Sequence, residues 1–383
     1  MVRRKIVFVS TNSLLHLRGV ERWVLEVSTK LKSSVILTFS VGLSNIKDVK
    51  ERVTEIKARS RGIEWHEFRA LSHENLGKGV PSLIGRIMRH IVIPINFKEV
   101  VRLLKGKIVY LIIGDAYQAV LLAIIAMISG ARRIILGLHA RPSYIRFKHV
   151  KPILLFMNKV GLLKGIHTVN IVDALMLRGI LGKITIWWIP NGVDCKKLKP
   201  GIKRNDRFQV LFVGALSEDK GIDTFIETAR IVKSKYDDVL FSIVSVGGPL
   251  KSVVEEACKE GVVEFLGFVS DNELRQLYAE SHIAVFPSRD EAFGLVSLEA
   301  QTSGTPVIAT DLPAFKQSVI NGVTGILVKP YSSQAFANTI IKVRDMWLNH
   351  RQKYVQMSEA ARKNAERFCW EEVVKIYESL FLE

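Results

Sequence analysis

Residues 287–304 of this 383-residue chain, PSRDEAFGLVSLEAQTSG, combine two carboxylates with an aromatic-glycine turn. Seven residues separate Glu291 from Glu299, and Phe293 and Gly294 lie between them. The apolar run 282–286 predicts a buried strand, residues 288–293 a loop, and residues 294–303 a helix. Because ligands of open α/β sheets bind at the carboxyl ends of the strands, this pattern predicts a ligand site there.

The helix expected at Gly294 could bind a diphosphate. The first helical amides, near Phe293, Gly294 and Leu295, lack intrahelical partners and carry the positive end of the helix dipole. Glu291 in the loop is then expected to face a sugar. Glu299 within the helix needs a polar partner such as ribose hydroxyls, because a buried unpaired carboxylate is too costly. The alternative for either acid alone is a solvated surface position.

The wider pattern resembles the signature of the group 1 retaining glycosyltransferases, which have the two-domain fold called GT-B. PSRDEAFGLVSLEAQTSGTPVIATD, followed by NGVTGILVKP, resembles the family's Glu-x7-Glu region. LRGVERWVLEVSTKL, WIPNGVD and VLFVGALSEDKGIDTFIETARIV resemble, in chain order, its first glycine loop and helix, its interdomain segment and the opening of its second domain. The resemblance covers most of the chain. It implies transfer of a hexose from a nucleotide-diphosphate sugar to a hydroxyl of a glycan or lipid-linked acceptor, with retention of anomeric configuration.

The resemblance also implies roles for single residues. Lys220, in the loop after the strand that ends at Gly214, matches the lysine that neutralises the departing diphosphate, and Gly214 is also expected to bind the donor. His139 matches the histidine that approaches the sugar and acceptor from the first domain, and a structural histidine is the alternative. Gly19 belongs to the phosphate-facing glycine loop. Val269 would bind the nucleobase through its backbone, which leaves UDP, GDP and ADP open.

The chain departs from the family pattern at Ala215, where an arginine is usual. Arg289 and Lys316 are candidates to replace that cation, and Arg18 stands in the glycine loop where a second glycine is usual. Asp271 is expected to cap a helix.

The alternatives to a glycosyltransferase are a GT-B epimerase or phosphorylase, or a non-catalytic sugar-nucleotide-binding scaffold. No Asp-x-Asp signature and no His or Cys cluster occurs in the sequence, so neither a metal nor another cofactor is expected.

The domain organisation follows from apolar runs that alternate with helix-length amphipathic segments, a pattern typical of α/β proteins with parallel sheets. We expect two Rossmann-like doubly wound domains that face a cleft, since the chain exceeds the usual size of one core. The expected parts are an acceptor-side domain 1–194, a hinge linker 195–208, a donor-binding domain 209–366 and a terminal helix 367–383 that packs on the first domain. The expected strands are 6–10, 35–39, 109–113, 134–138, 184–189, 209–213, 240–246, 262–265, 283–286, 307–309 and 325–328.

The three cysteines, Cys195, Cys258 and Cys369, show neither zinc-ligand spacing nor a disulfide framework. We expect them to be packing residues in a reducing cytoplasm. No amino-terminal signal peptide is expected. The most apolar stretch, 108–130, is interrupted by Gly114 and Asp115, and the remainder is shorter than the roughly 20 residues that span a bilayer.

Charge is distributed unevenly along the chain. Residues 1–194 contain 31 Lys and Arg against 12 Asp and Glu, whereas the remainder contains 24 against 25. Segments 86–107 and 141–165 mix cations with large apolar residues, which favours an anionic acceptor and peripheral contact with an anionic membrane. The alternative is a basic, solvated surface. Nucleic acid is not an expected partner, because the chain has neither zinc-finger spacing nor an RNP-like aromatic motif.

Overall fold

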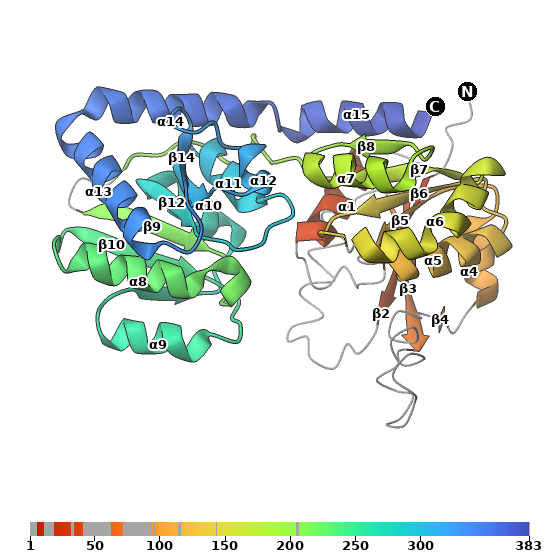
Figure 1. Ribbon diagram of the computed structural model, residues 1–383, viewed down its shortest axis with the longest axis horizontal. Helices are drawn as coiled ribbons and strands as arrows, with labels where there is room; N and C mark the ends of the chain where they lie inside the picture. Colours follow the sequence, from red (N-terminus) through yellow and green to blue (C-terminus); the bar gives the residue numbers. More distant parts are fainter. Residues whose placement is uncertain are drawn as a thin grey trace. The chain divides into compact units, whose positions relative to one another are not determined.

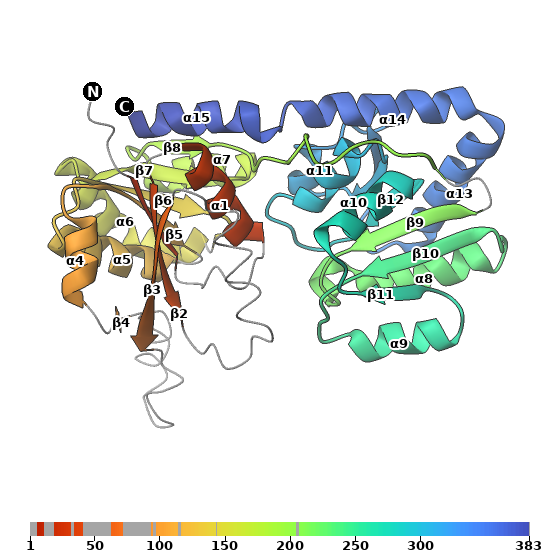
Figure 2. The same cartoon turned by 180° about the vertical axis from the view of Figure 1, so that it is seen from behind.

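The chain forms two compact units (Figures 1 and 2). The computed structural model describes residues 6–10, 19–31, 34–40, 63–71, 93–94, 97–113, 116–142, 144–203 and 207–382. Unit 1 comprises Met1–Pro190 and Val374–Glu383, and unit 2 comprises Asn191–Val373. Arg18 lies outside the described residues.

Unit 1 contains an eight-stranded sheet of order β4-β3-β2-β1-β5-β6-β7-β8. Its pairings are parallel except that between β3 and β4. The strands are β1 (Ile6–Ser10), β2 (Ser34–Ser40), β3 (Glu64–Leu71), β4 (Ile93–Pro94), β5 (Ile108–Ile113), β6 (Arg133–Leu138), β7 (Leu163–Thr168) and β8 (Ile186–Trp188). The helices are α1 (Gly19–Leu31), α4 (Phe97–Leu104), α5 (Ala116–Ile128), α6 (Tyr144–Lys159), α7 (Ile171–Leu181) and the end of α15 (Trp370–Leu382).

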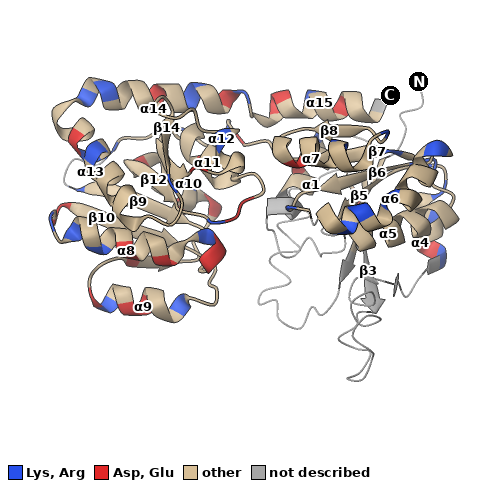
Figure 3. Ribbon diagram, in the orientation of Figure 1, with Lys and Arg blue, Asp and Glu red and all other residues tan. Residues whose placement is uncertain are grey.

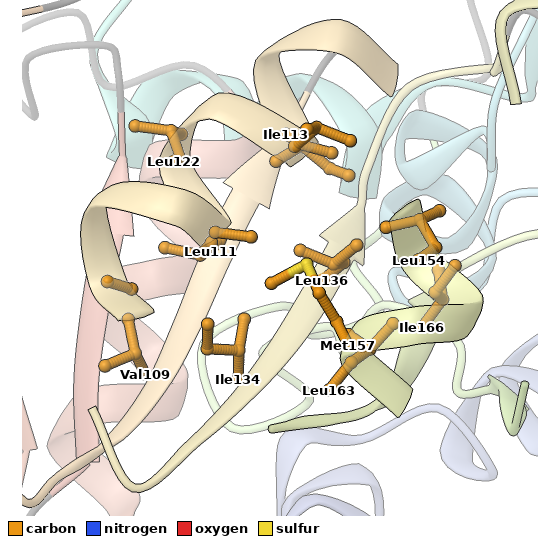
Figure 4. Close-up of a cluster of buried hydrophobic side chains, with 14 of the residues drawn as sticks. Val109, Leu111, Ile113, Leu122, Ile134, Leu136, Leu154, Met157, Leu163 and Ile166 are labelled. Atoms are coloured by element: carbon orange, nitrogen blue, oxygen red, sulfur yellow. The ribbon is translucent and has the colours of Figure 1, made fainter. Parts of the chain in front are cut away.

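The two faces of the unit 1 sheet have different cores, because successive side chains of a strand point to opposite faces. On one face, Val109 and Leu111 of β5 pack with Leu122 of α5 and Leu154 of α6 (Figure 4). The other face carries a cluster of aromatic rings covered by α1 and α15. Its members are Phe8, Trp23, Tyr110, Tyr377 and Phe381, with ring centroids 5.3–6.5 Å apart in the contacting pairs.

Unit 2 contains a six-stranded parallel sheet of order β11-β10-β9-β12-β13-β14. The strands are β9 (Phe208–Val213), β10 (Val239–Val244), β11 (Glu264–Gly267), β12 (Ile283–Phe286), β13 (Val307–Thr310) and β14 (Gly325–Val328). The helices are the 3₁₀ turn η4 (Glu218–Lys220), α8 (Ile222–Lys233), α9 (Lys251–Lys259), α10 (Asp271–Glu280), α11 (Leu295–Thr302), α12 (Pro313–Lys316), α13 (Ser333–Asn349), α14 (Arg351–Glu366) and the first turn of α15. Phe212, Phe225 and Phe241 lie in the core between the sheet and α8.

The expected class of two doubly wound α/β domains is confirmed, and each predicted strand is present with its ends shifted by at most two residues. Strands β3, β4 and β7 were not predicted. In β7 the misleading signals are Lys164 and Gly165 within a segment interpreted as a basic surface. Gly165 has a packing reason, because a Cβ there would lie 2.4 Å from the ring of Trp187 on β8.

The prediction of three unpaired cysteines is wrong. Cys195 and Cys369 form a disulfide with a Cα–Cα distance of 5.5 Å, and Cys258 is free. The two cysteines are 174 positions apart, so local spacing gave no sign of their pairing. In addition, within the described ranges no helix combines the length and low polarity that a membrane crossing requires.

Candidate functional site

Neighbouring strands β9 and β12 mark the point where the strand order of the unit 2 sheet reverses. Ligands of open α/β sheets bind outside the carboxyl ends of the strands at such a switch point. The segment after β9 carries Gly214 and Lys220, and the segment after β12 carries Glu291 and Gly294. The topology therefore brings four of the predicted site residues to one edge of one sheet.

Lys220 and Glu291 form an ion pair in which Nζ donates to Oε2 at 2.8 Å. The lysine side chain is 29% exposed and the glutamate side chain 17%. An ammonium group has three donors, so Lys220 can hold Glu291 and still donate to a phosphate. The structure thus joins two residues that the sequence assigned to different parts of a ligand.

Gly221 allows the two loops to approach each other. Its φ is +69°, and a Cβ would lie 2.0 Å from the carbonyl oxygen of Pro287. The backbone N–H groups of Arg289 and Asp290 donate to the carbonyl oxygen of Asp219 at 2.8 and 3.3 Å. This backbone contact fixes the loop of Lys220 against the loop of Glu291.

Gly294 is the N-cap of α11 and has a φ of +78°. A Cβ there would lie 2.7 Å from the ring of Phe315 and 3.6 Å from Cγ of Glu291. Leu295 follows as the first helical residue, so the helix begins where the sequence predicts an amide-rich phosphate site. At Gly214, a Cβ would lie 3.3 Å from the ring of Phe212 and 3.9 Å from the Lys220 side chain.

Glu299 lies on α11, five positions after Gly294, and is partly buried. The hydroxyl of Tyr278 on α10 donates to its Oε2 at 3.0 Å. The sequence argument required a polar partner for this carboxylate, and Tyr278 supplies one within the protein. Ribose hydroxyls as a further partner stay a prediction.

Phe293 and Val269 occupy different environments. Phe293 is buried and packs edge-on against Phe368 at 6.3 Å, so its side chain belongs to the core. Val269 lies between β11 and α10 and is partly buried. The predicted cap at Asp271 is wrong: the N-cap is Ser270, which forms a reciprocal capping box with Glu273.

The two cations proposed to replace the usual arginine are held by acids. Arg289 contacts Asp223 and lies 3.8 Å from Glu218. Lys316 pairs with Asp311 at 2.9 Å. Ala215 itself is exposed. Because each of these cations is already paired with an acid, neither takes the place of the arginine that is usual at Ala215.

His139 follows β6 in unit 1 and is buried, with 8% of its surface exposed. Its ring lies 4.2 Å from the ring of Trp23 on α1. Gly19, the first residue of α1, is one helical turn before Trp23. Gly19 and His139, which are both predicted site residues, thus belong to neighbouring elements of unit 1.

A chain of hydrogen bonds determines where the proton of His139 lies. The carbonyl oxygen of Ile189 can only accept, so His167 donates to it from Nε2 at 2.9 Å. Burial lowers the pKa of His167 to about 4, which leaves its Nδ1 unprotonated at neutral pH. That nitrogen accepts from the Tyr110 hydroxyl at 2.5 Å, and the Tyr110 oxygen in turn accepts from Nε2 of His139 at 3.1 Å.

The result is a neutral His139 with its proton on Nε2. Burial, with a smaller contribution from nearby His167, lowers the pKa of His139 well below its usual range. Burial also raises the pKa of the Tyr110 hydroxyl well above its usual range, so this hydroxyl keeps its proton. Nδ1 of His139 is buried and has no hydrogen-bond partner among the described residues. As the unprotonated ring nitrogen, it is a hydrogen-bond acceptor.

Residues 196–364 match the family model for group 1 glycosyl transferases. This match covers less than half of the chain. The matched segment contains Gly214, Lys220, Glu291, Gly294 and Glu299. A D-inositol 3-phosphate glycosyltransferase of Corynebacterium urealyticum is 31% identical over 224 residues, which cover 52% of this chain and 52% of that relative. The chain thus spans about half the length of the curated relatives it matches.

The likeness to solved structures extends over both units. Anabaena HepE in complex with UDP has a TM-score of 0.74 at 19% identity and covers 98% of this chain and 99% of its own. Sucrose-phosphate synthase from Thermosynechococcus elongatus has a TM-score of 0.73 at 17% identity and covers 99% of each chain. The fold of the protein is therefore GT-B.

Four residues that shape these sites were not predicted from the sequence. Gly221 could have been predicted, because it ends the SEDKG loop that carries Lys220. Tyr278, Tyr110 and His167 could not, since each lies 21 or more positions from its partner and becomes a neighbour only through the fold.

Proposed function

We propose that the protein is a retaining glycosyltransferase that moves a hexose from a nucleoside-diphosphate sugar to a hydroxyl of a glycan or lipid-linked acceptor. The observation that carries this proposal is the Lys220–Glu291 pair at the switch point of the unit 2 sheet, beside the amino terminus of α11. An ammonium group and free helix amides suit a diphosphate. A carboxylate next to them suits sugar hydroxyls.

In the proposed reaction, the bond between C1 of the sugar and the diphosphate oxygen breaks, and a bond from the acceptor oxygen to C1 forms on the same face. The proton of the acceptor hydroxyl passes in that step to an oxygen of the leaving diphosphate. Lys220 and the amides at Gly294 and Leu295 stabilise the negative charge of the leaving diphosphate. The proposal includes no metal ion or other cofactor. His139 is included as a hydrogen-bond acceptor through Nδ1.

The donor and the location are parts of the same proposal. A uridine donor is the first candidate because structures with this fold are described as complexes with UDP and with UDP-glucose. We also propose a cytoplasmic enzyme in peripheral contact with an anionic membrane. The cysteines no longer support the cytoplasmic location, since two of them form a disulfide.

The test combines ligand binding with turnover. UDP, GDP and ADP sugars are added singly to the purified protein, and the melting temperature is measured, because a ligand that binds only the native state stabilises it. The stabilising donor is then incubated with glycan and lipid-linked acceptors. We expect product with the anomeric configuration of the donor, determined by proton NMR, and equal rates with and without a chelator.

Substitutions locate the chemistry. Lys220→Ala and Glu291→Gln are expected to lower kcat by at least about 100-fold, in line with the loss of one group that stabilises developing charge. The matched controls are Lys251→Ala and Glu255→Gln, which remove the partners of an exposed ion pair on α9. Donor binding without any turnover would identify a scaffold, which Ala215 favours. Product of inverted configuration, or loss of turnover with the chelator, would contradict the mechanism.

A further inference from the structure

Helix α6 presents large apolar side chains to solvent. Ile145, Ile153 and Phe156 on the helix and Val160 directly after it are 67%, 44%, 61% and 55% exposed. Their spacing of eight, three and four residues puts them on one helical face. The opposite face is buried in the unit 1 core through Phe147, Val150, Leu154 and Met157. The exposed apolar side chains are therefore not needed to pack α6 against the core.

Helix α7 continues this apolar surface. Ile171, Leu175 and Met176 are exposed, whereas its buried residues belong to the same core as those of α6. The two helices contact each other and cover the same face of the sheet (Figure 1). Their exposed sides consequently point away from the sheet together. We call this surface the α6–α7 face.

The sequence segment that forms the α6–α7 face is rich in cations and nearly free of acids. Figure 3 shows basic and no acidic residues on α6. The single acid in segment 141–189 is Asp173, which is buried and accepts from the Tyr144 hydroxyl. The cations of the segment are Arg141, Arg146, Lys148, Lys151, Lys159, Lys164, Arg178 and Lys183.

We propose that the α6–α7 face binds the surface of an anionic lipid bilayer. Apolar side chains flanked by Lys and Arg insert at the level of the headgroups while the cations contact anionic lipids, each adding attraction. A second copy of the chain fits less well, because a two-fold contact through this face would bring two cation-rich surfaces together without exposed acids to pair with them. A polyanion without lipid would leave Ile153 and Phe156 in water.

This proposal deepens the proposed function, since it assigns a surface to the membrane contact of an enzyme with a lipid-linked acceptor. The binding itself needs no turnover. A Lys220→Ala variant should therefore lose transfer and still bind vesicles, which separates failure of one proposal from failure of the other.

The test is sedimentation of the full chain with vesicles of phosphatidylcholine and phosphatidylglycerol in roughly equal amounts, compared with phosphatidylcholine alone. We expect binding to the anionic vesicles only, weakened by added salt. Phe156→Ser and Ile153→Ser should each lower the partition coefficient by about tenfold. The Lys148→Glu and Lys159→Glu double variant should lower it by at least about tenfold.

Matched controls lie on exposed surfaces of unit 2. Leu348→Ser on α13 and the Lys353→Glu and Lys363→Glu double variant on α14 should bind as the unchanged protein does. Circular dichroism verifies that each variant is folded. Equal binding to both kinds of vesicle, equal losses in the controls, or no binding at all would overturn the proposal. Self-association that requires Phe156, seen by light scattering without vesicles, would instead make this face a contact between copies.

Discussion

The hydroxyl oxygen of Tyr110 accepts a hydrogen bond from Nε2 of His139 at 3.1 Å, because its own proton is donated to His167. Tyr110 therefore acts as a positioning residue for His139. It fixes the neutral tautomer whose unpaired nitrogen is Nδ1. The direction in which these hydrogen bonds are donated is set by the carbonyl oxygen of Ile189, which can only accept.

Tyr110→Phe keeps the ring in the core and removes the hydroxyl. We expect a mixture of His139 tautomers, because no acceptor then selects the Nε2–H form. Transfer is expected to fall by about tenfold in kcat, with little change in KM for the donor. Nitrogen NMR of labelled histidine checks the tautomer directly. An unchanged His139 spectrum would contradict the assigned role.

The matched control is Tyr117→Phe. Tyr117 and His149 form a similar pair at 2.9 Å, but this pair is exposed on α5 and α6. Removal of the Tyr117 hydroxyl should leave both kcat and the His139 spectrum unchanged. Equal effects of the two substitutions would indicate a general loss of packing rather than control of the tautomer.

Acid should destabilise the protein through His167. Its pKa is about 4 when folded, compared with about 6.5 for an exposed histidine, so below pH 6.5 the unfolded state binds more protons. The stabilising contribution is complete above about pH 6.5 and is lost as the pH falls toward 4, a change of about 3 kcal/mol. His139 acts in the same direction. Urea unfolding at several pH values measures the slope.

His167→Gln is the informative comparison for this slope. A glutamine amide can donate to Ile189 and accept from Tyr110 but does not titrate in this range. The variant should therefore show a shallower loss of stability between pH 6.5 and 4. If its slope matched that of the unchanged protein, the loss would have to come from other groups.

Much of the unit 2 site could be predicted from the sequence, because its residues lie in two short loops after strands with clear apolar patterns. Glu291 and Gly294 were identified from such a local pattern, and Lys220 from the resemblance to the family. Their mutual contact could not be predicted, since it depends on the adjacency of β9 and β12 and on the close approach at Gly221.

In unit 1, the surroundings of His139 depend on contacts between residues that are distant in the sequence. The hydroxyl of Tyr110 is 57 positions from His167, and no periodic pattern records that distance. Strand β7 was not predicted for a different reason, because Lys164 in its sequence suggested a surface segment. The Lys164 side chain instead reaches the carbonyl oxygen of Leu380 on α15 at 2.6 Å.

Gly294→Ala should weaken both the fold and donor binding. The φ of +78° is unfavourable for alanine, and the new Cβ would lie 2.7 Å from the Phe315 ring. Gly322 provides a matched control, since it has the same φ and no atom within 4 Å of a new Cβ. Gly322→Ala should cost about 1 kcal/mol in unfolding free energy. Gly294→Ala should cost more and also lower donor affinity, as measured by urea unfolding and by titration of the stabilising donor. Equal costs would contradict the close approach at Gly294.

Reduction of the Cys195–Cys369 disulfide should destabilise unit 2. The bond joins residues 174 positions apart, near the two ends of a unit that spans Asn191–Val373, and so closes almost the whole unit into a ring. Opening so long a loop restores entropy to the unfolded chain, and the expected loss is about 5 kcal/mol. Urea unfolding with and without a reducing agent measures it. A Cys258→Ser variant should show the same loss, since Cys258 is free. Alkylation of the unchanged protein, denatured without reduction, should label Cys258 alone. Labelling of all three cysteines would contradict the disulfide.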